Sequence, residues 1–71
     1  MNEMENIEEI VSVHDSFMMG HLQEDDVSEK LGEIFDDLLE DLSKKEIKKT
    51  IKSLELEDEF EEIAFDILGD M

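Results

Sequence analysis

The sequence predicts an all-α fold, a small bundle of three to four helices that residues 1–71 form as a single domain. Apolar residues recur at helical spacing along most of the chain, whereas alternation with period two is confined to residues 54–57. The chain has no proline and only 3 glycines, and its 39% hydrophobic content is above that of a disordered chain. We therefore expect four helices, over residues 4–22, 26–42, 44–54 and 56–68.

The first two expected helices carry long apolar stripes. The stripe of the first helix contains Ile7, Ile10, Val11, Phe17, Met18 and Leu22. The stripe of the second contains Val27, Leu31, Ile34, Phe35, Leu38 and Leu42. Residues 23–26 interrupt the pattern, and Asp25 or Asp26 is expected to cap the second helix because a carboxylate can accept hydrogen bonds from its free N–H groups.

The third and fourth expected helices are shorter. Ser43 and Glu46 have the spacing of a capping box, in which each side chain accepts a hydrogen bond from the other residue's backbone N–H. The apolar positions that follow are Ile47, Ile51 and Leu54, and then Leu56, Phe60, Ile63, Ala64, Ile67 and Leu68. Gly69 is expected to end the last helix, because glycine readily takes the left-handed conformation found there.

The composition excludes several classes of function. With 23 acidic residues against 6 lysines, the formal net charge of −17 opposes binding to bare DNA, RNA or an anionic membrane. The absence of cysteine excludes disulfides and thiolate zinc sites, and no loop or helix motif of a known catalytic site is present. We expect a protein that is not an enzyme, needs no cofactor or metal, and stays in the cytoplasm, because it lacks a signal peptide and an apolar run of transmembrane length.

The same charge weakens the folded state. A 71-residue chain buries a small core, and the mutual repulsion of its carboxylates opposes compaction. A homodimer, or folding completed on a partner, would supply the missing stability, so both a monomer and a homodimer stay open.

The lysines are concentrated in one short segment. Outside residues 44–52, the chain carries 22 acidic residues and Lys30, a formal charge of −21. Inside it are Glu46 and five lysines: Lys44, Lys45, Lys48, Lys49 and Lys52. We favour the interpretation that they balance neighbouring acidic faces; the alternative is a contact surface for nucleic acid, which the surrounding negative field would repel.

The acidic faces of the second and fourth helices are the candidate binding surface. Carboxylates three or four residues apart lie about 5–6 Å apart along a helix, a separation comparable to that of neighbouring phosphates. The expected partner-binding residues are Glu29, Glu33, Asp36, Asp37 and Glu40 on the second helix and Asp58, Glu62 and Asp66 on the fourth. The alternative is a solvated face that only keeps the protein soluble.

In size and charge the whole chain resembles the small acidic DNA-mimic inhibitors made by phages and mobile elements, such as anti-restriction and anti-CRISPR proteins. The resemblance involves no sequence motif. It implies an inhibitor, with a role against host defence, that occupies the nucleic-acid channel of its target. The expected partner is then a basic nucleic-acid-binding protein, with no direct contact to nucleic acid or membrane.

A second hypothesis is an acidic helical adaptor or regulator that binds a protein partner through an apolar patch. Phe65 is expected to point toward the acidic side of the last helix and to serve as an anchor with an acidic rim. Met19 and Val13 are expected at the edges of the first stripe, outside its centre. His14 and His21 share the apolar arc of the first helix and are expected to be partly buried or interfacial, since no third metal ligand accompanies them.

Overall fold

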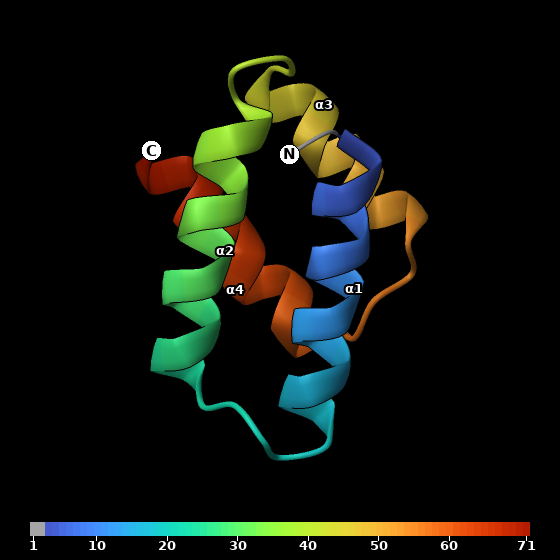
Figure 1. The fold of residues 1–71 in the computed structure, drawn as a ribbon, viewed down its shortest axis with the longest axis vertical. Coiled ribbons are helices and arrows are strands. Elements are labelled where there is room, and N and C mark those ends of the chain that lie inside the picture. The colour runs from blue at the N-terminus through green and yellow to red at the C-terminus, as the bar shows by residue number, and fades with distance from the viewer. Residues whose placement is uncertain (1–2) are drawn as a thin grey trace.

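Four α-helices and no strands make up residues 3–71, which are the residues that the computed structural model describes (Figure 1). They are α1 (Glu3–Met18), α2 (Glu24–Leu38), α3 (Lys44–Ser53) and α4 (Asp58–Asp70). Helices α1 and α2 run antiparallel, α4 packs against α2, and α3 packs against α4. The predicted all-α bundle is confirmed.

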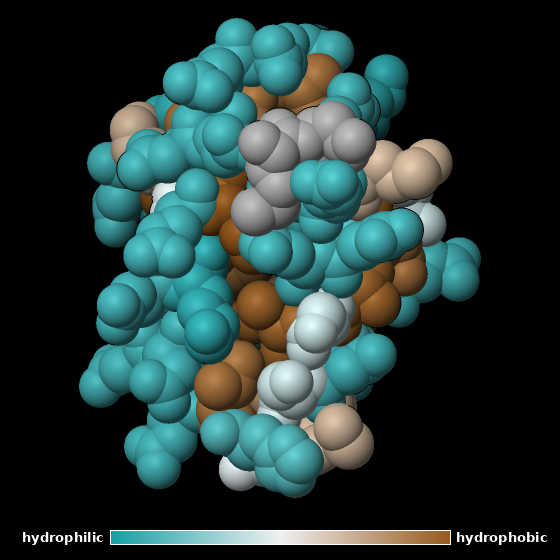
Figure 2. All heavy atoms as spheres, in the orientation of Figure 1, coloured by the Kyte–Doolittle hydropathy of each residue, from teal (hydrophilic) through white to brown (hydrophobic). Residues whose placement is uncertain are grey.

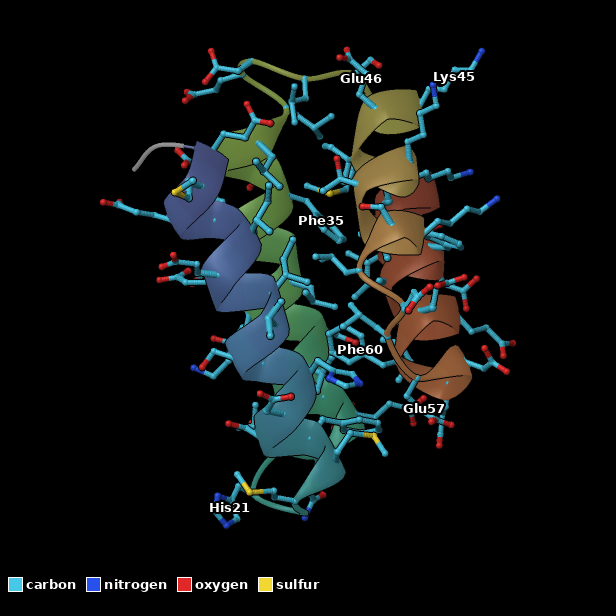
Figure 3. The ribbon with its side chains drawn as sticks, turned by 90° about the vertical axis from the view of Figure 1, so that its right-hand side faces the viewer. His21, Phe35, Lys45, Glu46, Glu57 and Phe60 are labelled. Atoms are coloured by element: carbon cyan, nitrogen blue, oxygen red, sulfur yellow. The ribbon has the colours of Figure 1, made fainter. Side chains whose placement is uncertain are left out.

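The core lies where the apolar stripes of the four helices meet. Phe35 of α2 and Phe60 of α4 are fully buried, and both point into the space between the α1–α2 pair and the α3–α4 pair (Figure 3). Around them lie Ile10, Val13, Val27, Leu31, Ile34, Leu38, Ile47, Ile51, Ile63, Ala64 and Leu68. The predicted stripes of the later helices are confirmed, because most of their residues lie in this core. The stripe predicted for the first helix is only partly confirmed: Ile10 is its one core residue, and Met18 is 51% exposed. Val13, expected at an exposed edge, is buried instead.

Helix α1 ends at Met18, earlier than the expected residue 22. The reason is Gly20, whose φ of 81° is the left-handed conformation that stops a helix. The N–H of His21 then donates to the carbonyl of Ser16 at 2.9 Å, and the N–H of Gly20 to that of Phe17 at 3.1 Å. This pair of bonds is a Schellman motif, which satisfies carbonyls at the end of the helix.

The other helix ends follow the predictions in part. Ser43 and Glu46 form the expected capping box, with the Glu46 N–H donating to Ser43 Oγ and the Ser43 N–H to Glu46 Oε1, both at 3.2 Å. Helix α2 is capped by Gln23 and not by an aspartate; Asp26 instead accepts from the Gln23 N–H at 3.2 Å. The expected end at Gly69 is wrong, because α4 continues through it to Asp70.

None of the helices in residues 3–71 is both long enough and apolar enough to cross a bilayer.

Two glycine substitutions should have opposite effects. A methyl group at Gly20 or Gly32 meets no atom within 4 Å, so only the backbone decides the outcome. We expect Gly20→Ala to lower the free energy of unfolding by about 1–2 kcal/mol, because L-residues are strained at positive φ. Gly32→Ala, in the middle of α2, should raise it by about 1 kcal/mol. Urea denaturation followed by circular dichroism measures both, and a Gly20→Ala variant as stable as the parent or more stable would contradict the Schellman ending of α1.

Candidate protein-binding surface

The acidic residues of α2 face water. Glu29, Glu33 and Asp36 are exposed on the side of the helix opposite the buried stripe, as their spacing predicts. Glu40 is exposed as well, but it lies two residues beyond the end of the helix. The helical row on α2 is therefore shorter than predicted, and it continues into the connection to α3. Figure 2 shows hydrophilic atoms covering the α2 side of the face in view.

Asp37 is used inside the fold. It is only half-exposed, and its Oδ2 accepts a hydrogen bond of 2.6 Å from Nδ2 of Asn6 on α1. Asn6 is 2% exposed, and its Oδ1 has no hydrogen-bond partner among the described residues. Asp37 thus joins α1 to α2, and its carboxylate is less available to a partner than those of its neighbours. Sequence spacing could not reveal this, since nothing indicated that Asn6 would be buried.

The acidic residues predicted on α4 face water as well. Asp58, Glu62 and Asp66 are exposed, and α4 packs directly against α2. Of the 23 acidic residues, which all lie within residues 3–71, only Asp37 and Glu61 are not exposed. The chain therefore carries 21 exposed carboxylates on 4665 Å² of accessible surface.

The lysines do not neutralise these carboxylates directly. Within residues 3–71, no lysine ammonium lies within 4 Å of a side-chain carboxylate. Lys48 and Lys52 instead place their Nζ atoms 5.9 and 6.0 Å from the centre of the Phe65 ring, and Lys44 donates to the backbone carbonyl of Met71. These contacts join α3 to α4, so the lysines balance the charge only over longer distances.

Phe65 has surroundings different from those expected. Its ring is half-buried against the core, and two lysines of α3 lie over it. A cation over an aromatic face is attracted to the ring and shields it from a partner. This side of Phe65 is therefore bordered by lysines and not by the expected acidic rim. Helical spacing along α4 could not show that α3 would lie beside it.

The two histidines are in different environments. His14 is partly buried, and its Nε2 accepts a hydrogen bond of 3.1 Å from the N–H of Glu57, the residue that precedes α4. Its ring meets Phe60 edge-on, with centroids 5.1 Å apart, and its Nδ1 lies 3.2 Å from Oδ1 of Asp15. His21 is exposed beyond the end of α1, so its expected partial burial is wrong, and the alternative of a place at an interface stays a prediction. His14 serves to position the start of α4.

Among residues 3–71, no three histidine or acidic side chains are grouped so that they could hold a metal ion. Comparison with protein-family models, with curated proteins and with solved structures gives no match for this chain.

The hydrogen bond between Asn6 and Asp37 can be tested by replacing the Asn6 amide with a second carboxylate. In Asn6→Asp, two carboxylates face each other in a buried position, and we expect the free energy of unfolding at pH 7 to fall by about 1–3 kcal/mol. Repulsion disappears when one carboxyl is protonated, so the variant should recover stability relative to the parent as the pH is lowered toward about 4.

The matched control is the double variant Asn6→Asp/Asp37→Asn, which exchanges the two partners and keeps one amide and one carboxylate. It should restore only the part of the loss that comes from charge repulsion, because a carboxylate at the buried position 6 still loses its hydration. Denaturant titrations at pH 7 and pH 4 measure all three proteins. If Asn6→Asp is as stable as the parent at pH 7, the two side chains do not face each other as the geometry indicates.

Proposed function

We propose that this chain is an acidic protein inhibitor that imitates nucleic acid and occludes the basic DNA- or RNA-binding cleft of a target protein. It acts by stoichiometric, reversible binding, without catalysis and without a cofactor. The observation that carries the proposal is the row of exposed carboxylates on α2 and α4, with no lysine paired to them among the described residues. The proposed contacts are Glu29, Glu33, Asp36, Glu40, Asp58, Glu62 and Asp66, with Asp37 contributing its charge from the α1–α2 seam.

The charge density supports this proposal. One exposed carboxylate per ~220 Å² follows from 21 groups on 4665 Å² of surface. Duplex DNA, with one charge per ~1.7 Å of axis on a cylinder about 20 Å across, carries one phosphate per ~100 Å². The protein is therefore within about a factor of two of DNA.

The helical scaffold supports it too. Carboxylates at steps of three and four residues keep a spacing of about 5–6 Å, and α2 and α4 place two such rows on neighbouring helices. A cleft lined by Lys and Arg attracts this surface over long range and releases its counterions on binding, as it would with nucleic acid. A role against host defence nucleases, as in the phage inhibitors that the chain resembles, belongs to the same proposal.

An adaptor that docks through Phe65 has less support, since that ring is half-buried and lies beneath Lys48 and Lys52.

The experiment that tests the proposal is capture of a partner from lysate on the immobilised chain at about 50 mM salt, followed by elution in a salt gradient. We expect a nucleic-acid-binding protein that elutes before about 300 mM salt and that added duplex DNA displaces. A partner that withstands high salt and ignores DNA would contradict occlusion of a nucleic-acid site.

A pair of charge variants then separates the carboxylate row from net charge. Glu29→Lys/Glu33→Lys/Asp36→Lys reverses three charges on α2, whereas Asp41→Lys/Glu55→Lys/Asp70→Lys makes the same change at scattered exposed positions. We expect the row variant to bind the captured target at least ~10-fold more weakly than the scattered variant, because only it removes contacts within the cleft. Equal losses, measured by surface plasmon resonance, would mean that net charge alone drives binding.

A further inference from the structure

An apolar face of α1 is left open to solvent. Met4, Ile7, Val11 and Met18 recur at helical spacing and form what we call the α1 outer face. His14 lies between Val11 and Met18 on this side of the helix and is partly buried by its contacts with Glu57 and Phe60. Met4 is 71% exposed and Met18 51% exposed, while Ile7 and Val11 are only partly buried. Helix α1 packs mainly against α2, which covers its other side, where Asn6, Ile10 and Val13 are buried. Figure 2 shows hydrophobic atoms reaching the surface beside α1.

Carboxylates border this face. Glu8 and Asp15, seven residues apart, follow one edge, and Glu3 lies four residues before Ile7 at the other. A hollow of about 420 Å³ at the N-terminal end is lined by Glu3, Met4, Ile7 and Glu8. An apolar floor with carboxylates on both sides suits a lysine or arginine, whose methylene stem lies on the floor while its charged head meets a carboxylate.

We propose that the α1 outer face binds a cationic amphipathic helix of a partner protein. The fifteen residues from Met4 to Met18 span about 21 Å, which matches four turns of a docked helix. Apolar side chains of that helix pack on the stripe, and a lysine or arginine enters the hollow. The flexible thioethers of Met4 and Met18 adapt to the shape of the incoming side chains.

Charge selects this occupant over a second copy of the chain. Two α1 outer faces placed against each other would bring Glu3, Glu8 and Asp15 of both copies together, which like-charge repulsion opposes. A cationic helix would instead be attracted to these carboxylates. This interface goes beyond the proposed inhibitory role, because it lies on another helix. It recognises the spacing of apolar side chains on the partner as well as the partner's charge.

The test uses a synthetic 18-residue peptide of leucine and lysine in the pattern of an amphipathic helix, and a scrambled peptide of the same composition. Binding to the full chain is measured by fluorescence anisotropy at 150 and 500 mM salt. We expect the patterned peptide to bind at least ~10-fold more tightly than the scrambled one, and to keep most of this advantage at the higher salt because it comes from apolar contact. Equal binding of the two peptides would overturn the proposal.

The variants Met4→Lys and Met19→Lys form a matched pair. Both replace an exposed methionine with the same charge, at 71% and 65% exposure, but Met19 lies outside the α1 outer face and beyond the end of the helix. We expect Met4→Lys to weaken binding of the patterned peptide at least ~10-fold, and Met19→Lys to weaken it by no more than ~2-fold. Equal weakening would overturn the proposal, since net charge alone would then explain it.

Two further outcomes bear on the occupant. A homodimer seen by sedimentation and abolished by Met4→Lys would assign the face to a second copy and overturn the proposal. The triple variant at Glu29, Glu33 and Asp36 should bind the peptide as well as the scattered triple variant, whether or not the inhibitory role holds. A selective loss of peptide binding in the row variant would place the peptide on α2 and also overturn the proposal.

Discussion

The structure depends on one constraint: its 23 carboxylates must stay hydrated. Removing an unpaired carboxylate from water costs far more than a small core can offset, and six lysines are too few to pair with them. The chain satisfies the constraint by confining the core to apolar stripes, with Asn6 as the one buried polar residue of the described part. Its only half-buried carboxylates are Asp37, which accepts a hydrogen bond from Asn6, and Glu61.

This constraint also shapes the outer surface. Because the acidic residues of α2 stand opposite its buried stripe, packing of the core orders them into a row on a rigid support. Five of the six lysines lie on α3, where Lys48 and Lys52 contact Phe65 and Lys44 contacts Met71. The row on α2 has only Lys30 beside it, and among the described residues no lysine forms an ion pair with a carboxylate. The arrangement that keeps the carboxylates in water is thus the arrangement we propose for binding a basic cleft, and α1 adds an apolar face of a different kind.

Local patterns predicted the fold well and the surface only in part. Helical periodicity identified the core positions of α2, and the Ser43–Glu46 capping box was predicted from two residues, because both features depend on neighbours within one helix. Contacts between helices were not accessible in this way. The hydrogen bond of Asp37 with Asn6 joins residues 31 apart, and the lysines over Phe65 come from another helix, so no local pattern indicated either.

The pairing of helices also bears on how quickly the molecule forms. Helices α1 and α2, and then α3 and α4, are neighbours in sequence and pack together through short connections, with α2 against α4 as the main contact between the two pairs (Figures 1 and 3). Domains dominated by such local contacts fold in microseconds to milliseconds, because little chain entropy is lost before contacts form. From this topology we expect the chain to fold within milliseconds, which would suit a protein proposed to act one molecule per target.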